Sequence, residues 1–294
     1  MEHKSNKLKR SVRFNTQTKL KDKANKMETE SLKICILVPT YNNAGTLAAL
    51  LGEVLKYCSD VIVVDDGSTD STPQILSALQ TASDDLRVVT HERNRGKGAA
   101  LRTGFREART LGYTHCITID SDLQHYPDDL PKFFAAIENN PRALIVGSRN
   151  IAAEGMPQRN TFANRFSNFW FRLYTGVNLS DTQTGYRAYP LNGLSGLGLL
   201  TSRYEAELEL LVFAAWKGTP IESIPIKVYY PPEGERVSHF RPFQDFGRIS
   251  LLNTVLLFVS ILYGIPCRAV NWVKRRAAKR KTAVRAPGNK PAGK

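Results

Sequence analysis

Cysteines are few in this sequence, and their spacing decides which kinds of site they can form. The 4 cysteines form no CxxC pair and no cluster with histidine. This spacing excludes a cysteine-based zinc site and suggests no disulfide framework, so buried reduced thiols are the simpler interpretation. The first 30 residues also lack the apolar run of roughly 7 to 15 residues that a secretory signal requires. We therefore expect the chain from residue 31 onward to stay in the cytosol.

Two common phosphate-binding motifs are absent as well. No GxGxxG sequence follows the first apolar run, at 34–39. The segment Gly96-Lys97-Gly98 has neither the spacing nor the Ser or Thr of a phosphate loop. These absences argue against a nicotinamide-dependent dehydrogenase and against a P-loop ATPase.

Acidic residues are scarce at the two ends of the chain. Residues 1–30 contain nine Lys or Arg and four acidic residues, and residues 266–294 contain ten Lys or Arg and no acid. The formal net charge of +14 therefore belongs to the ends, while 31–265 is nearly neutral. A nucleic-acid-binding protein needs a basic face on its fold, so this distribution argues against a nucleic acid partner. We predict basic disordered tails at 1–30 and 274–294.

From residue 31, short apolar runs alternate with longer amphipathic segments. The runs are rich in Val and Ile, which predicts strands, and the segments between them have helical periodicity. The predicted strands are 34–39, 61–66, 87–92, 115–120 and 143–148, and the predicted helices are 44–57, 72–83, 97–111 and 128–139. This alternation predicts an α/β fold with a doubly wound, mostly parallel sheet. Ligands of such sheets bind beyond the carboxyl ends of the strands.

Three polar side chains at alternate positions follow the fourth predicted strand. They are Asp120, Asp122 and Gln124. If the backbone there is extended, all three lie on one face. Their hard oxygen atoms suit Mg²⁺ or Mn²⁺, which commonly also binds substrate phosphates. The alternative is a surface turn that caps the next helix near Pro127.

Acidic and basic residues also flank the other predicted strand ends. Asp65 and Asp66 follow the second strand, where a carboxylate can accept hydrogen bonds from a nucleobase or a ribose hydroxyl. Tyr41 and Asn42 are placed to flank the same base. Lys97 opens the third predicted helix, where exposed N–H groups and positive charge suit an anion. A simple turn and a solvated helix charge are the alternatives.

Six motifs follow one another between residues 33 and 240: VPTYNN, VVDDGSTDST, NRGKGAALRTGF, DSDLQHYPDDL, VGSR and DTQTGYRAY. In this order they resemble the family 2 glycosyltransferases with a GT-A fold, and within them the polyprenyl-phosphate sugar synthases. The resemblance implies a GT-A catalytic domain over 31–239. It also implies an inverting, metal-dependent transfer of a hexose from a nucleotide sugar, of the GDP-mannose or UDP-glucose type, to a polyprenyl phosphate. No QxxRW sequence is present, which disfavours the processive polysaccharide synthases of this family.

The resemblance implies a role for particular residues. The residues implied to bind the nucleotide sugar are Pro39, Tyr41, Asn42, Asn43, Asp65, Asp66, Lys97 and Asp120. The implied ligands of the metal, Mg²⁺ or Mn²⁺, are Asp120, Asp122 and Gln124. The residues implied to meet the acceptor phosphate are Arg149, Arg159 and Arg165. Asp122 and Arg149 are implied to be catalytic.

Two positions depart from the family pattern. Asn43 stands where the family often has Glu, and Glu233 stands where a late RxxGxSK motif has Arg. Arg236, His239 and Arg241 are the alternatives for that arginine's role.

The chemistry of the acceptor decides whether the reaction needs a general base. A phosphate monoester is already an oxyanion at neutral pH, because its second pKa is about 6. A hydroxyl acceptor requires a base, and Asp181 is the candidate. The alternative function is therefore transfer to another membrane lipid or a hydroxyl acceptor, and an inactive membrane-surface scaffold is the alternative from a different class.

The C-terminal third predicts contact with a membrane surface. Phenylalanines recur every three residues from Phe240, with arginines between them, as in an amphipathic interfacial helix. An uncharged run of 19 residues, 249–267, follows, which is just long enough to span a bilayer. A spanning helix would carry the basic C-terminal tail away from the cytosol, against the positive-inside tendency. We therefore predict a monotopic or re-entrant anchor over 240–273 at the cytoplasmic face, with a core helix of a soluble domain as the alternative.

A stripe of small and polar residues interrupts this apolar run. It consists of Ser250, Asn253, Ser260 and Gly264. Such a stripe fits a helix that lies in the membrane interface or docks on a partner.

Overall fold

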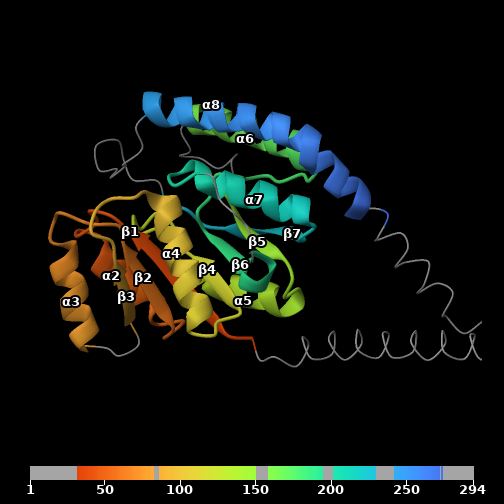
Figure 1. Cartoon of the computed structure of the whole chain (residues 1–294). Coiled ribbons are helices and arrows are strands. Elements are labelled where there is room, and N and C mark those ends of the chain that lie inside the picture. Colours follow the sequence, from red (N-terminus) through yellow and green to blue (C-terminus); the bar gives the residue numbers. More distant parts are fainter. Residues whose placement is uncertain are drawn as a thin grey trace, which may run out of the picture. The chain divides into compact units, whose positions relative to one another are not determined.

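The computed structural model describes residues 32–82, 86–149, 158–194, 201–229, 242–271 and 273. The predicted tails at 1–30 and 274–294 lie outside these residues. In the described part, one mixed sheet has the strand order β3-β2-β1-β4-β6-β5-β7 (Figure 1). The strands are β1 (Ile34–Thr40), β2 (Val61–Asp65), β3 (Leu86–Thr90), β4 (His115–Thr118), β5 (Leu144–Arg149), β6 (Arg187–Pro190) and β7 (Ile221–Ile226).

The sheet is mostly parallel, as the sequence predicts. Strand β6 runs antiparallel to both of its neighbours, β4 and β5, and the other described pairs are parallel. The carboxyl ends of β1, β2, β4 and β5 therefore point to one edge. The sequence pattern missed β6 because this strand has four residues and begins with the charged Arg187.

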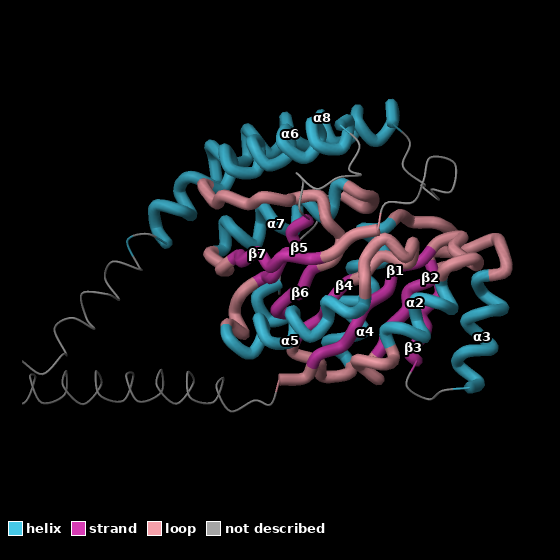
Figure 2. The backbone as a smooth tube through the Cα atoms, turned by 180° about the vertical axis from the view of Figure 1, so that it is seen from behind, coloured by secondary structure: helices cyan, strands magenta, loops and turns pink. Residues whose placement is uncertain are grey.

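Helices cover both faces of the sheet, which gives two separate cores (Figures 1 and 2). The helices are α2 (Leu47–Val54), α3 (Thr72–Ala82), α4 (Lys97–Thr110), α5 (Leu130–Asn139), α6 (Gln158–Thr175), α7 (Glu205–Lys217) and α8 (Pro242–Val259). Side chains of alternate residues of β1 pack into the two cores. Cys35 and Leu37 lie in the core that includes α4, α6 and α7, and Ile36 and Val38 lie in the core that includes α2 and α5. Burial on both faces explains why the strands read as continuous apolar runs.

The C-terminal helix docks lengthwise on the domain. Helix α8 runs through residue 249 without a break, so the two segments expected there form one helix, continued by a π-helical turn at Ser260–Gly264. Leu252 and Leu256 are buried in the core beside α6 and α7. The hydroxyl of Tyr174 on α6 donates to the carbonyl of Asn253 at 2.9 Å. The predicted polar stripe therefore faces the protein's own domain.

Candidate functional site

A tight turn follows β4 and carries the predicted metal ligands. Leu123 has a left-handed backbone with φ of 60°, and the backbone N–H of Gln124 donates to Asp122 Oδ1 at 3.0 Å. The backbone is therefore not extended here, because the Asp122 side chain closes a turn, and the condition under which the three side chains would share one face is not met. Burial, and after it the negative charge of Asp120, raise the pKa of Asp122 to about 6. The two carboxylates thus lie close enough to repel each other electrostatically.

Asp120 pairs with Lys97, at the N-terminus of α4. Lys97 Nζ lies 2.7 Å from Asp120 Oδ1 and 2.9 Å from Glu207 Oε2, on the first turn of α7. Burial opposes the charged forms of Lys97 and Asp120. The attraction between their opposite charges outweighs burial, so the pKa of Lys97 lies above its ordinary value and the pKa of Asp120 lies below its ordinary value. Glu207 was missed in the sequence, although an acid within the apolar run EAELELL was a visible signal.

Gly185 lets the backbone before β6 approach this ion pair. A Cβ atom at position 185 would lie 2.7 Å from Lys97 Nζ and 2.9 Å from Asp120 Cγ, and would overlap Asp120 Oδ2. The carbonyl of Gly185 accepts a 2.7 Å hydrogen bond from the Thr118 hydroxyl on β4. A side chain at this position would therefore displace Asp120 or Lys97.

The loop after β1 is tied to its neighbours by two asparagines. Asn42 has a positive φ of 51°, and its Oδ1 accepts a 2.8 Å hydrogen bond from the backbone of Thr69 in the loop after β2. Asn43 Nδ2 donates to Ser121 Oγ, in the turn after β4, at 2.7 Å. These asparagines therefore join three strand ends, and their predicted contact with the nucleotide remains a prediction.

Two other residues predicted for the nucleotide site lie on β1 and just after it. Pro39 lies within β1, which extends to Thr40, and its carbonyl accepts from the Ser121 hydroxyl at 3.3 Å. Tyr41 follows the strand and is half-buried. Both residues lie at the sheet edge formed by the carboxyl ends of the parallel strands, where the nucleotide site is predicted, and their roles remain predictions.

Asp65 is the last residue of β2 and Asp66 follows it, and the two carboxylates have different environments. Asp65 is fully buried, and its Oδ1 accepts from the backbone of Ser68 at 2.9 Å, while its Oδ2 has no hydrogen-bond partner. Asp66 accepts from the backbone N–H groups of Arg95 and Gly96 at 2.9 and 2.7 Å and lies 2.6 Å from His91 Nδ1. Asp66 therefore shapes the loop that leads into α4, and Asp65 keeps an unused acceptor.

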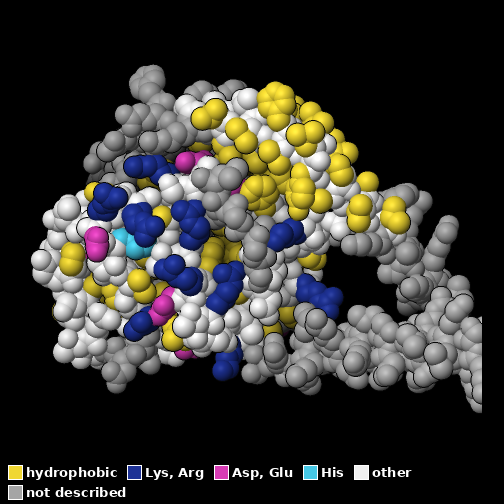
Figure 3. Space-filling model, viewed as in Figure 1, with side chains coloured by type: hydrophobic (Ala, Val, Ile, Leu, Met, Phe, Trp, Pro, Cys, Tyr) yellow, Lys and Arg dark blue, Asp and Glu magenta, His cyan; other side chains and the backbone are white. Residues whose placement is uncertain are grey.

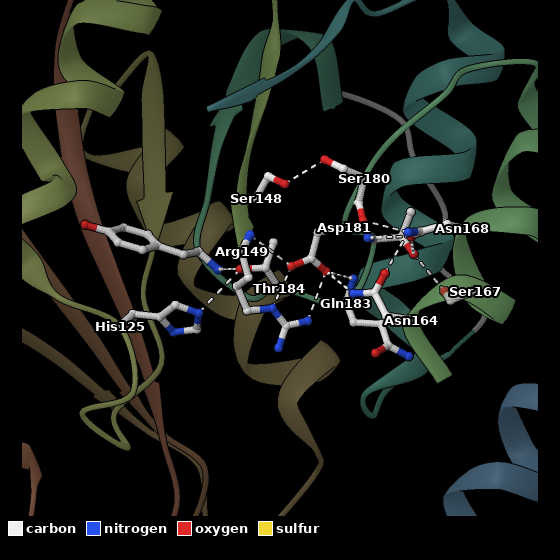
Figure 4. Close-up of polar contacts among 12 residues, drawn as sticks. His125, Ser148, Arg149, Asn164, Ser167, Asn168, Ser180, Asp181, Gln183 and Thr184 are labelled. Atoms are coloured by element: carbon white, nitrogen blue, oxygen red, sulfur yellow. Dashed lines mark hydrogen bonds and ion pairs between the residues drawn. The ribbon is translucent and has the colours of Figure 1, made fainter. Parts of the chain in front are cut away.

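Arg149 at the end of β5 forms a two-pronged ion pair with Asp181 (Figure 4). Its Nε donates to Asp181 Oδ2 at 2.6 Å and its second guanidinium nitrogen donates to Oδ1 at 3.0 Å. Asp181 is fully buried. Burial alone would raise the pKa of Asp181, but the hydrogen bonds and charge of Arg149 hold it below the ordinary value. The Arg149 guanidinium therefore occupies both carboxylate oxygens of Asp181, the candidate base for a hydroxyl acceptor.

Helix α6 holds the segment around Asp181 with a polar face. Asn164 Nδ2 donates to Asp181 Oδ1 at 2.6 Å, and Asn168 Oδ1 accepts from the backbone of Thr182 at 3.0 Å. The spacing of these asparagines, i and i+4, was the signal in the sequence. Arg165 is on the same helix and exposed. The side chain of Arg159 lies outside the described part, so both predicted phosphate contacts remain predictions.

His125 lies between the two charged clusters and was not predicted as a site residue. Its Nε2 is 3.4 Å from the hydroxyl of Thr184, and its Nδ1 is buried without a partner (Figure 4). Burial lowers the pKa of His125 to about 4, against the pull of Asp120. His125 is therefore neutral at pH 7. The QH pair in DSDLQHYP was the signal in the sequence.

The residue types at the turn suit a hard divalent cation. The negative charges of Asp120 and Asp122 repel each other, and two carboxylates plus an amide oxygen are ligands that suit Mg²⁺ or Mn²⁺ when substrate phosphates complete the sphere. Among the residues that the structure describes, no three His, Cys, Asp or Glu side chains are grouped to hold a metal. Glu233 and the three candidates for the role of the missing arginine, Arg236, His239 and Arg241, lie outside the described residues.

Comparison with known proteins identifies the family. The family model "Glycosyl transferase family 2" matches residues 35–191, and this chain belongs to that family. The UDP-N-acetylglucosamine–dolichyl-phosphate N-acetylglucosaminyltransferase of Methanococcus voltae is 31% identical over 67% of this chain and 86% of its own length. The polyprenol monophosphomannose synthase of Mycolicibacterium smegmatis is 30% identical over 65% of this chain and 75% of its own length.

A solved structure shares the fold. The glucosyl-3-phosphoglycerate synthase of Mycobacterium tuberculosis, crystallised with Mn²⁺, UDP-glucose and phosphoglyceric acid, superposes with a TM-score of 0.54. It is 20% identical, over 78% of this chain and 80% of that chain. This likeness shows the GT-A type of fold predicted from the motifs.

Proposed function

We propose that this protein transfers a hexose from a nucleotide sugar to a polyprenyl phosphate, with inversion at the anomeric carbon. The observation that carries the acceptor class is the Arg149–Asp181 pair. Asp181, the candidate base for a hydroxyl acceptor, is locked by two hydrogen bonds to Arg149. A phosphate acceptor needs no base, because it reaches the site as an oxyanion. The names of the M. voltae and M. smegmatis relatives support the same acceptor class.

The donor would bind at the carboxyl ends of β1, β2 and β4. The unpaired Oδ2 of Asp65 offers an acceptor for a base N–H or a ribose hydroxyl. Lys97 brings positive charge to the place where the diphosphate would lie beside Asp120. A divalent cation held by Asp120, Asp122 and Gln124 would supply charge that stabilises the leaving diphosphate.

The acceptor phosphate would be positioned by Arg149. Asp181 fixes the guanidinium at the carboxyl end of β5, near the turn that carries Asp122. Arg165 and Arg159 on α6 would complete the phosphate site. Fixed charges of this kind hold an oxyanion in line with the anomeric carbon, which is a positioning effect.

The lipid tail of the acceptor would reach the site from a membrane surface. Within the described residues, one helix, Ile249–Asn271, is long and apolar enough to cross a membrane. Its outer side is strongly apolar, with Leu262 and Phe258 exposed by 80% and 63%, and Phe169 on α6 is 61% exposed. Figure 3 shows hydrophobic side chains gathered over this part of the molecule.

Docking along the whole helix favours an anchor that lies in the membrane plane. Asn253 contacts Tyr174, Gly264 lies against the ring of Trp216, and Asn271 Nδ2 donates to the Trp216 carbonyl at 3.1 Å. A spanning helix would have to leave these contacts. We therefore favour a monotopic anchor at the cytoplasmic face, as predicted, over a spanning helix or a core helix of a soluble domain.

A donor screen tests the function. Purified protein is incubated with membrane extract and a panel of radiolabelled nucleotide sugars, with Asp122→Asn as the inactive control. We expect label in a lipid product that mild acid releases, because a sugar phosphodiester of a polyprenol is acid-labile. An acid-stable product would support the hydroxyl-acceptor alternative, and no transfer from any donor would support the scaffold.

A further inference from the structure

A buried group of three charges joins α4, the turn after β4 and α7. The Lys97 ammonium lies between Asp120 and Glu207, at 2.7 and 2.9 Å. The side chains of Lys97 and Glu207 are 16% and 10% exposed, so solvent screens their interaction weakly. Two carboxylates from different elements therefore hold the ammonium at one point.

The second oxygen of Glu207 has no use in the fold. Glu207 Oε1 is buried without a hydrogen-bond partner. A buried acceptor in that state is unfavourable, and a neutral side chain of the same size would avoid most of the penalty. Its other oxygen forms the ion pair with Lys97, and its charge also attracts the buried guanidinium of Arg187. The ion pair is therefore the contact through which this carboxylate can hold Lys97 in place.

Neighbouring glutamates on α7 behave differently. Glu209 Oε2 accepts hydrogen bonds from the backbone and hydroxyl of Thr201, at 2.9 and 2.6 Å, and so holds the segment before α7. Glu205 is buried on the same turn as Glu207, and its Oε2 has no partner, but it forms no ion pair with Lys97. Glu205 is therefore a matched control for the loss of a buried charge.

We infer that Glu207 is a positioning residue that holds the Lys97 ammonium in place for the donor diphosphate. Paired with Asp120 alone, the flexible lysine stem would follow the movements of that carboxylate. With Glu207 as a second partner, the ammonium keeps its place when Asp120 turns to another ligand. This inference rests on the proposed function, since it assigns Lys97 to the diphosphate of a nucleotide-sugar donor.

The first test separates positioning from donor binding. In Glu207→Gln the charge of Lys97 remains, so we expect the donor KM to change by less than about 3-fold. We expect kcat to fall by roughly 10- to 100-fold, because alignment in the transition state is lost. Glu205→Gln should stay within about 2-fold of the unmodified protein in both constants. Equal losses from the two substitutions would overturn the inference.

The second test asks whether Glu207 acts through Lys97. When Glu207→Gln is added to Lys97→Met, kcat should fall no further. If the two residues acted independently, the fold-losses in kcat of the two substitutions would multiply. The melting temperature gives a readout apart from activity. Lys97→Met leaves Glu207 buried and unpaired and should lower Tm by about 5 °C or more, and adding Glu207→Gln should restore part of that loss. The inference would be contradicted if the fold-losses in kcat multiplied in the double variant, or if the double variant recovered none of the Tm lost in Lys97→Met.

The outcome is distinguishable from failure of the proposed function. If the unmodified protein transfers no hexose, the Tm comparison still tests the Lys97–Glu207 pair. If Lys97→Met does not fold, calorimetric titration of Glu207→Gln with GDP and UDP replaces the cycle. A Kd within about 3-fold of the unmodified protein, together with the lower kcat, supports positioning. A Kd raised as much as kcat falls would make Glu207 a simple binding determinant.

Discussion

The charged form of Asp122 lowers the stability of the folded protein. Its pKa of about 6 lies above the ordinary value of an aspartate, because burial and Asp120 disfavour its charge. The folded state therefore binds this proton more tightly than the unfolded state does. Stability from this group is present at low pH and is lost as the pH rises through the window from about 4 to 6.

Asp122→Asn should separate stability from activity. We expect this variant, in EDTA, to be more stable than the unmodified protein at pH 7.5 by about 1 to 2 kcal/mol, since one pKa unit corresponds to about 1.4 kcal/mol and the group is partly exposed. The difference should shrink towards pH 4.5, while hexose transfer falls by several orders of magnitude. Urea unfolding at the two pH values measures the first effect, and a variant less stable at pH 7.5 would contradict it.

Arg149 is expected to support the fold as well as the acceptor site. Arg149→Ala would leave Asp181 buried with its charge unpaired, which should destabilise the protein by about 2 to 4 kcal/mol. Adding Asp181→Asn should recover part of this loss, measured by chemical denaturation. No recovery would mean that the arginine stabilises the fold through other contacts.

For that reason the acceptor role of Arg149 is better tested with Arg149→Lys. This variant keeps the charge and loses the two-pronged geometry. We expect a roughly 10-fold or greater loss in kcat/KM for the acceptor and a smaller loss for the donor, in kinetics that vary each substrate in turn. A defect confined to the donor KM would move Arg149 to the diphosphate site.

At the scale of elements, the segment between α6 and β6 joins the two halves of the site. Its Asp181 end is held by Arg149 and α6, and its Gly185 end lies against the Lys97–Asp120 pair. The antiparallel β6 brings this segment back between β4 and β5. A short strand therefore places the predicted acceptor and donor groups side by side.

Gly185→Ala tests the close approach. The methyl group would meet flexible side-chain ends, so we expect the fold to survive with a small change in Tm while transfer activity falls about 10-fold or more. Gly52→Ala on α2 is the matched control, since a Cβ there meets nothing within 4 Å. It should keep full activity and gain about 0.5 to 1 kcal/mol in stability. Full activity of Gly185→Ala would show that the site has more room.

At the scale of the whole molecule, one apolar surface distinguishes α6 and α8 from the rest of the domain. Exposed apolar residues on these helices and on the π-helical turn that continues α8 include Phe169, Leu173, Leu251, Phe258, Ile261 and Leu262. Large patches of this kind mark interaction surfaces. The inner side of α8 is committed to the domain, so the outer side is the part available to a membrane.

Charge on that surface should release the protein from membranes. We expect Phe258→Glu with Leu262→Glu to weaken binding to anionic vesicles by roughly 100-fold or more, since each apolar side chain contributes about 1.5 to 3 kcal/mol. Leu111→Glu, at an exposed leucine after α4, is the control and should bind as before. Vesicle flotation in high salt measures the apolar part, because salt screens the basic ends. Unchanged flotation of the double variant would exclude this surface.

Much of this architecture was readable from local sequence. Apolar runs and helical periodicity predicted the first five strands and the helices between them to within a few residues, because both signals depend on neighbours in the chain. The motif order predicted the family that the family model confirms. The positions of Asp65, Asp120 and Arg149 at one sheet edge followed from parallel topology.

The partners of those residues were decided by the tertiary structure. Lys97 and Glu207 are far apart in sequence and meet because α4 packs against α7, and Arg149 meets Asp181 because the segment before β6 returns to the end of β5. The turn at Leu123 and the docking of α8 on α6 and α7 likewise depend on side chains that local periodicity does not encode. Sequence pattern thus determined which groups stand at the edge, and packing determined which charges are paired and which atoms, such as Asp65 Oδ2, have no hydrogen-bond partner within the fold.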